Sequence, residues 1–366
     1  MIDHDSGSAS SFTFRAAPLV AACLLAGCFY PAYVAQGAVG QLDLLARARP
    51  LDDVIRDPKT PLRTALELSE IPAIKTYGRS YGLRIRRNYE TYADIGRGAA
   101  VWFVGASDPL AFKPRQWCFP IVGCFAGVGY FDEDEAIRFE QQLEAQGYDA
   151  LVRPASAYST SGWFHDPVLS TMLGAGDDAL PELADVILHE SVHATVFVPD
   201  EPFFNESFAE YTADALTDHW ITMRFGPGSP EDIAWTLGEA LRYPRIARTL
   251  KAHKDLEAVY KDPKLSRAAK LAAKTKIIDD LVTDLHQRRR PNNASLTEAA
   301  VYNGGAAALL AAHRGCGDLR SMVEAGKTLK RSDFTQSLQS DLTPIATLLV
   351  ERCRLKTGHA AAGSSR

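Results

Sequence analysis

The segment Ile187-Leu188-His189-Glu190-Ser191-Val192-His193 decides how the chain is interpreted, because it holds two histidines four residues apart with a glutamate directly after the first. On an α-helix this spacing places both imidazoles on one face, where they can bind a single metal ion. Glu190 is rotated by about 100° around the helix axis, so it still lies beside the metal and can take a proton from a water held there. We predict that this helix runs from Pro181 through Phe197.

A second helix is predicted to begin with Asn205-Glu206-Ser207-Phe208-Ala209-Glu210. The connection over residues 198–204 can extend about 23 Å at ~3.3 Å per residue, which allows the second helix to return antiparallel to the first. Glu206 would then face His189 and His193. Two histidines and one glutamate leave a fourth position open for water, as in catalytic zinc sites. The predicted cofactor is therefore one zinc ion per chain.

Two neighbours of Glu206 are predicted to support the metal ligands. Glu210 lies one helical turn later and can accept a hydrogen bond from the outer nitrogen of a ligand histidine, which would fix its tautomer. Asn205 directly precedes Glu206 in the same helix start. The alternative is that both glutamates lie on an ordinary exposed helix face, and that the histidines are surface residues of an amphipathic helix.

The sequence pattern of the rest of the chain predicts one α+β domain, with a small mixed sheet before a largely helical half. Strands are expected at 99–104, within 117–130, at 150–153 and at 158–164, and helices over most of 41–97, over 132–146 and over nearly all of the chain after residue 181. Ser229 should cap a helix that begins at Pro230. The domain is expected to span residues 28–356, and the small, polar segment 357–366 is predicted to be a disordered tail.

Composition argues against one class of partner. The 366 residues are 46% hydrophobic and 23% charged, with a formal net charge of -5, which is ordinary for a globular protein. A nucleic-acid-binding protein would carry a basic surface. The basic runs at 84–87 and 288–290 are short, and solvated helix or loop faces explain them better. We therefore expect no nucleic-acid partner.

Residues 1–27 are predicted to be a signal peptide, because the apolar stretch 16–28 has a suitable length and ends in small residues. Leu25-Ala26-Gly27-Cys28 resembles the bacterial lipobox, in which the cysteine is lipidated and becomes the mature N-terminus. Because Phe29 and not aspartate follows, the resemblance implies an outer-membrane lipoprotein that faces the periplasm. The alternative is a transmembrane anchor, since residues 16–42 carry no charge. Either interpretation attaches the protein to a membrane of the cell envelope.

The cysteine count agrees with a compartment outside the cytoplasm. Without Cys23 and Cys28, an even number of cysteines remains: Cys118, Cys124, Cys316 and Cys353. An oxidising compartment permits two disulfides among them. A pair between Cys118 and Cys124 would close a short turn, but the sequence leaves the connectivity open.

The chain resembles the gluzincin metallopeptidases, in which the HExxH helix is followed by a helix that begins Asn-Glu. Asn205, Glu206 and Ala209 match this pattern, although the connection from His193 is shorter than in the best-known aminopeptidases. The resemblance is closer to a family of bacterial lipoproteins described as predicted aminopeptidases, and it implies a zincin-like fold and an aminopeptidase activity. Ser161 stands where that family would have an aliphatic residue. Further matching stretches lie at 40–42, 117–120, 129–131, 147–149, 158–160, 162–164, 166–167 and 292–294.

Candidate substrate-binding residues lie upstream and downstream of the two helices. The predicted strand 158–164 could bind a peptide by strand addition, with Ser159, Thr160 and Gly162 at the substrate edge. Candidates for stabilising a transition-state oxyanion are Tyr158, His165 and Tyr302, each of which could instead be a packing or surface residue. An aminopeptidase also needs an acid for the substrate ammonium, and the candidates are Asp166, Asp200 and Glu201.

Three functions remain open from the sequence. The first is hydrolysis of a peptide bond by water, with Glu190 as base and then acid. The second is a non-catalytic envelope lipoprotein in which zinc is structural or absent. The third is a zinc hydrolase of non-peptide amides, including components of the cell wall.

Overall fold

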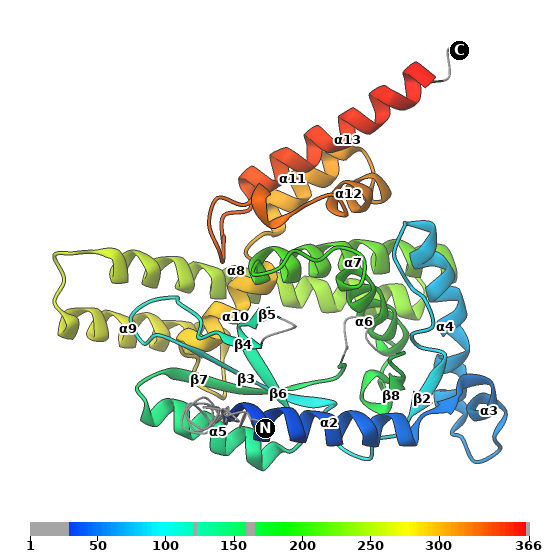
Figure 1. Ribbon diagram of the computed structural model, residues 1–366, viewed down its shortest axis with the longest axis horizontal. Helices are drawn as coiled ribbons and strands as arrows, with labels where there is room; N and C mark the ends of the chain where they lie inside the picture. Colours follow the sequence, from blue (N-terminus) through cyan, green and yellow to red (C-terminus); the bar gives the residue numbers. More distant parts are fainter. Residues whose placement is uncertain (1–28, 120–122, 159–164, 364–366) are drawn as a thin grey trace, which may run out of the picture.

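The longest of the described strands, β3 (Val101–Ser107) and β7 (Asp149–Ala155), pair antiparallel, and β6 (Gly127–Tyr130) pairs antiparallel along the other edge of β3 (Figure 1). The computed structural model describes residues 29–119, 123–158 and 165–363. The predicted strands at 99–104 and 150–153 correspond to β3 and β7. Both strands are longer than predicted, because each continues to the end of the ladder that they share.

Helices cover both faces of this sheet. Trp102, Val104 and Ala106 of β3 point to one face and share a buried cluster with α5 (Glu133–Ala145). On the other face lies α10 (Asn293–Asn303), whose Thr297 hydroxyl bonds the Ser107 hydroxyl at 3.4 Å. The alternation of side chains along β3 is therefore that of a strand buried on both sides.

The N-terminal part contains more extended chain than predicted. Its helices are α2 (Phe29–Arg47), α3 (Leu51–Arg56) and α4 (Leu62–Ser80). The prediction of mainly helix over 41–97 is wrong after Ser80, where Gly82 takes a left-handed φ of 85° that ends helical geometry. The chain then forms β2 (Thr91–Ala93), which pairs with β1 (Arg49–Pro50) and β8 (Val168–Leu169).

The region 117–130, predicted as strand or loop, contains β4 (Trp117–Phe119) and β5 (Gly123–Phe125) before β6. The predicted substrate-edge residues Ser159, Thr160 and Gly162 lie outside the described residues. The same holds for Cys28 and the predicted signal peptide.

The C-terminal half is helical, as predicted. Its α-helices are α6 (Ala179–His193), α7 (Pro202–Phe225), α8 (Pro230–Lys261), α9 (Arg267–Leu285), α10, α11 (Ala306–Cys316), α12 (Leu319–Gly326) and α13 (Thr343–Gly363). Short 3₁₀ turns lie at Ser170–Met172 and Arg331–Asp333. The predicted cap is confirmed, because the Ser229 side chain accepts a hydrogen bond from the backbone N–H of Asp232. Among the described residues, none of the helices combines the length and apolar character needed to cross a membrane.

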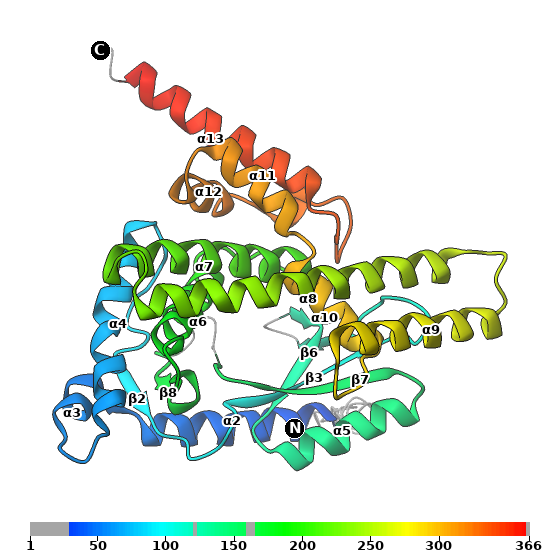
Figure 2. The same cartoon turned by 180° about the vertical axis from the view of Figure 1, so that it is seen from behind.

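The helices α11, α12 and α13 form a group on the far side of α7 from the sheet (Figures 1 and 2). A disulfide between Cys316 and Cys353 joins α11 to α13, and another between Cys118 and Cys124 joins β4 to β5. Helix α13 continues to Gly363, seven residues into the segment 357–366 predicted as a disordered tail. Three consecutive alanines at 360–362 favour helix there.

Candidate metal centre

Helices α6 and α7 pack side by side through the main core of the molecule. On α6, Leu183, Ile187 and Leu188 are completely buried, and on α7 the rings of Phe204 and Phe208 are buried as well. These apolar faces fix the rotation of each helix about its axis. The polar residues between them are therefore held in defined directions.

The connection between the two helices, residues 194–201, lies earlier in the chain than predicted. Helix α6 ends at His193 and not at Phe197, and α7 begins at Pro202, three residues before Asn205. Asn205 is buried and bonds the backbone of Val198 twice, donating to its carbonyl at 2.8 Å and accepting from its N–H at 2.9 Å. Asn205 thus fixes the loop onto the start of α7, and this is its structural contribution to the site.

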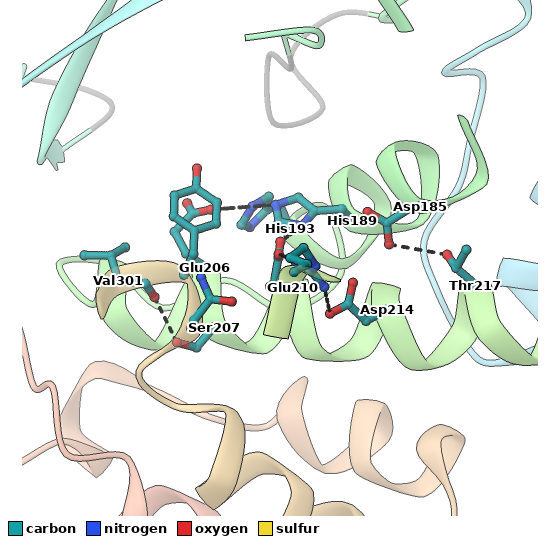
Figure 3. A network of polar contacts seen from close by, with 12 residues as sticks. Asp185, His189, His193, Glu206, Ser207, Glu210, Asp214, Thr217 and Val301 are labelled. Carbon is teal, nitrogen blue, oxygen red and sulfur yellow. Dashed lines mark hydrogen bonds and ion pairs between the residues drawn. The ribbon is translucent and has the colours of Figure 1, made fainter. Parts of the chain in front are cut away.

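His189, His193 and Glu206 converge on one point between the two helices (Figure 3). The Nε2 atoms of the histidines are 3.1 Å apart, and the Glu206 Oε2 atom lies 3.3 Å from that of His193 and 3.7 Å from that of His189. Their possible ligand atoms all lie within 4.8 Å of one another, and all three residues are partly buried. The sequence prediction that these three side chains come together is in agreement with this geometry.

The outer nitrogen of His189 faces a second carboxylate. Its Nδ1 atom lies 3.5 Å from Oε2 of Glu210. The other oxygen of Glu210 accepts a hydrogen bond of 2.6 Å from Arg242 of α8, which also donates to Asp214 at 2.6 Å and to Glu239 at 2.7 Å. A continuous chain of polar contacts therefore runs from α8 through Glu210 to the imidazole of His189.

Two series of residues four apart build this arrangement. Asp185, His189 and His193 follow one another along α6, and Glu206, Glu210 and Asp214 follow one another along α7 (Figure 3). Residues four apart share a helical face, so the two faces can meet over about two turns. The sequence prediction used only two members of each series, and the same periodicity would also have indicated Asp185 and Asp214. Nothing local to α8 indicated Arg242.

The carboxylates between α6 and α7 favour positively charged groups at the centre. Burial opposes the charged form of His189, but hydrogen bonds that the imidazole donates to Glu206 and Glu210 outweigh it and raise the pKa of the imidazole. Burial likewise favours the neutral form of Glu206, but His193 and His189 hold the pKa of its carboxyl well below the usual range. Burial, and then the charge of Glu210, raise the pKa of Asp185 to about 7. Arg242 compensates part of this concentration of partly buried carboxylates, and a bound cation or protons would compensate the rest.

Glu190 is partly buried on the next face of α6. Burial raises the pKa of Tyr89, and the charge of Glu190 raises it further. Tyr89 has a φ of 62°, which is uncommon for a bulky residue, and its backbone N–H donates to the Asp166 carbonyl at 2.8 Å. The extended segment after α4 therefore delivers a buried, neutral phenol to the neighbourhood of Glu190, which the sequence did not indicate.

Tyr302 lies beside His189, with ring centroids 6.3 Å apart and planes nearly parallel at 18°. Its hydroxyl accepts a hydrogen bond of 3.3 Å from Nη2 of Arg153, on β7. Arg153 also pairs with Glu298 of α10. Burial raises the pKa of Tyr302, and the charge of Glu206 adds to the effect, so the hydroxyl keeps its proton. The structure thus brings Tyr302 to the site, with Arg153 as a partner that the sequence did not indicate.

The other candidates from the sequence are placed differently. Tyr158 packs edge-on against Phe131, with ring centroids 5.3 Å apart, and burial raises its pKa to about 12. His165 is exposed. Glu201 is completely buried, pairs with Arg331 at 3.3 Å and accepts a hydrogen bond from the backbone of Gln339, so it serves packing and is no ammonium site.

Comparison with known proteins identifies the family of the chain. No curated protein and no solved structure matches the chain. A family model described as "Putative aminopeptidase" matches residues 32–339, which is well over half of the chain and includes α6, α7 and α10. The chain therefore belongs to this aminopeptidase family.

Proposed function

We propose that the protein is a zinc-dependent aminopeptidase with a zincin-like fold, in which His189, His193 and Glu206 hold one zinc ion. The observation that carries the proposal is the spacing of their three candidate ligand atoms, at 3.1, 3.3 and 3.7 Å. Ligand atoms about 2.0–2.2 Å from a tetrahedral zinc ion lie roughly 3.3 Å from one another. The donor set and its spacing therefore fit zinc with one position open.

Zinc bound there would lower the pKa of a coordinated water and polarise the substrate carbonyl. The rest of the chemistry falls to side chains of the protein. Glu190 accepts the proton of the attacking water and delivers it to the leaving amine, as a general base and then a general acid. Glu210 keeps the Nδ1–H tautomer of His189, because its carboxylate lies 3.5 Å from that nitrogen.

Tyr302 is proposed to stabilise the oxyanion of the transition state. Its oxygen accepts the hydrogen bond from Arg153, so its own O–H remains available as a donor. Preorganised donors of this kind supply a large part of the catalysis in acyl-transfer enzymes. Because the pKa of Tyr302 is raised, the donor stays protonated at neutral pH.

The variant Glu190→Gln tests the assignment of the base. It should bind zinc in the same amount as the unchanged protein and lose peptide hydrolysis by about 10²–10⁴-fold, the range attributed to general acid–base catalysis. Glu182→Gln is the matched control, because Glu182 is an exposed residue of the same helix and should leave activity unchanged. Full activity in Glu190→Gln would contradict the mechanism.

A digest of paired peptides tests the type of enzyme. Peptides with a free amino terminus should lose residues from that end, and the same peptides after N-acetylation should not. Cleavage inside acetylated peptides would indicate an endopeptidase instead. Bound zinc without cleavage of peptides or of cell-wall amides would support the non-catalytic alternative.

The proposed location is the periplasmic face of the bacterial outer membrane. It is supported by Leu25-Ala26-Gly27-Cys28 and Phe29 in the sequence, with Cys28 as the proposed lipid attachment point. The two disulfides are consistent with an oxidising compartment. Mass spectrometry of the mature N-terminal peptide would test the proposed lipid attachment, since acyl chains on Cys28 should add their mass to that peptide.

A further inference from the structure

Helix α2 presents an outward face that is apolar throughout residues 31–42. The exposed residues in this range are Pro31, Ala32, Val34, Ala35, Ala38, Val39 and Leu42. At about 100° per residue they form one continuous stripe along the helix. Val34, Val39 and Leu42 are 56%, 68% and 66% exposed. Single exposed apolar residues are ordinary, whereas a contiguous stripe of them marks a contact surface.

The opposite face of α2 is fixed to the body of the protein. The Gln36 side chain donates to the Gly129 carbonyl at 3.1 Å and accepts from the Phe131 N–H at 3.2 Å, and the hydroxyl of Tyr33 accepts from the Gly129 N–H at 3.1 Å. Gly40 lies directly against the ring of Phe131, which leaves no room for a side chain. The helix therefore cannot rotate to bury its apolar stripe.

The sequence before α2 indicates what covers this stripe. Residues 16–42 contain no charged side chain, and α2 begins at Phe29, the residue that follows Cys28. No linker separates the proposed attachment point from the helix. A lipid on Cys28 that is inserted in a bilayer would hold the start of α2 at the membrane surface. Figures 1 and 2 show α2 along one edge of the molecule, at the opposite end from α13.

We propose that the stripe of α2 lies on the phospholipid bilayer and orients the enzyme on the membrane, an inference that rests on the proposed attachment through Cys28. The contact is apolar and not electrostatic. The exposed acidic residues Asp132, Glu133, Asp134 and Glu135 follow Phe131, the residue against which Gly40 packs, and they would be repelled by anionic lipid. The surface therefore fits phospholipid with no net charge. Apolar side chains in such interfacial helices enter the boundary between headgroups and acyl chains.

Cysteine variants of the full chain test this contact. Val34→Cys and Val39→Cys would be labelled with a polarity-sensitive fluorophore, and the protein reconstituted in phosphatidylcholine vesicles that contain doxyl-labelled lipid. Met223→Cys, on α7 and 58% exposed in the unchanged protein, is the matched control. Cys118, Cys124, Cys316 and Cys353 are paired in disulfides, and the unsubstituted chain measures background labelling.

Labels about 5–10 Å deep at the membrane boundary should emit at shorter wavelength and be quenched about threefold, while the label at position 223 should be unaffected. A chain that is recovered with the membranes but carries unquenched labels at positions 34 and 39 would overturn the inference alone. Recovery of the chain in the aqueous fraction would instead overturn the proposed attachment through Cys28. Disulfide-linked dimers of Val39→Cys in the membrane would show that a second copy covers the stripe, and would also overturn the inference.

Discussion

The histidines of α6 and the hydrogen-bonded pair of Arg153 and Tyr302 lie at the same centre, but they are brought there in different ways. The two histidines of α6 stand four residues apart, so one turn of helix brings them together. Arg153 and Tyr302 are separated by 149 residues and come from β7 and α10. They meet only because α10 packs on the sheet. The comparison teaches that the metal-binding part of the site is local, while the part proposed to stabilise the transition state depends on the tertiary fold.

The largest effect that would sharpen this comparison is expected for Tyr302→Phe. Removing one oxyanion donor commonly lowers kcat by about 10²–10³-fold. Zinc content should stay the same, because no proposed ligand is changed. The measurement is kcat and zinc stoichiometry on the same preparation. A variant with normal kcat would show that the Tyr302 ring only packs against His189 and that the oxyanion donor lies elsewhere.

The sequence predicted the two α6 histidines and Glu206 because each belongs to a helical pattern with a fixed period. It placed α7 three residues late and extended α6 to Phe197, because the loop is closed by contacts between distant residues. One of these is the hydrogen bond from the backbone N–H of Arg84 to the Thr195 hydroxyl at 2.7 Å. Helix ends set by such contacts leave little trace in periodicity.

The second expected effect concerns Arg242, which connects α8 to the metal centre through Glu210. Arg242→Ala should weaken zinc binding by about tenfold, at the lower end of the range for residues that orient metal ligands. Arg245→Ala is the matched control, since Arg245 lies three residues later on α8 and bonds the Leu285 carbonyl at an exposed position. Competition with a chelator of known affinity measures the change. Equal zinc affinity in both variants would show that Glu210 holds its position without Arg242.

Arg242 could not be predicted from its surroundings in the sequence. It lies within a long, largely exposed helix with several other basic residues, and only the fold places its guanidinium among Glu210, Asp214 and Glu239. The general lesson is that carboxylates of the site follow helical periodicity, whereas their cationic partner comes from another element. The sheet order and the position of α10 are likewise set by long-range packing.

The smallest expected effect is a dependence of stability and of zinc affinity on pH. It depends on charges from both helices of the metal centre. In the metal-free protein the pKa of His189 is raised and that of Glu206 is lowered. Stability from His189 is therefore fully present below its ordinary pKa of 6.5 and is lost as pH rises through its raised value. Stability from Glu206 is present above its ordinary pKa of 4.5 and is lost as pH falls through its lowered value.

In the metal-free protein, the ion pair of His189 and Glu206 should thus contribute most to the stability of the fold between about pH 4.5 and 6.5. Zinc needs the neutral imidazole, so its affinity should rise by about tenfold per pH unit for each proton released, up to the raised pKa of His189. The difference in Tm between zinc-loaded and metal-free protein should accordingly increase from pH 6 to pH 8. In Glu210→Gln the increase should be smaller, because one of the carboxylates that raise the pKa of His189 is removed. A difference in Tm that does not change with pH would mean that His189 is already neutral without metal, and that the carboxylates of α7 do not control its charge.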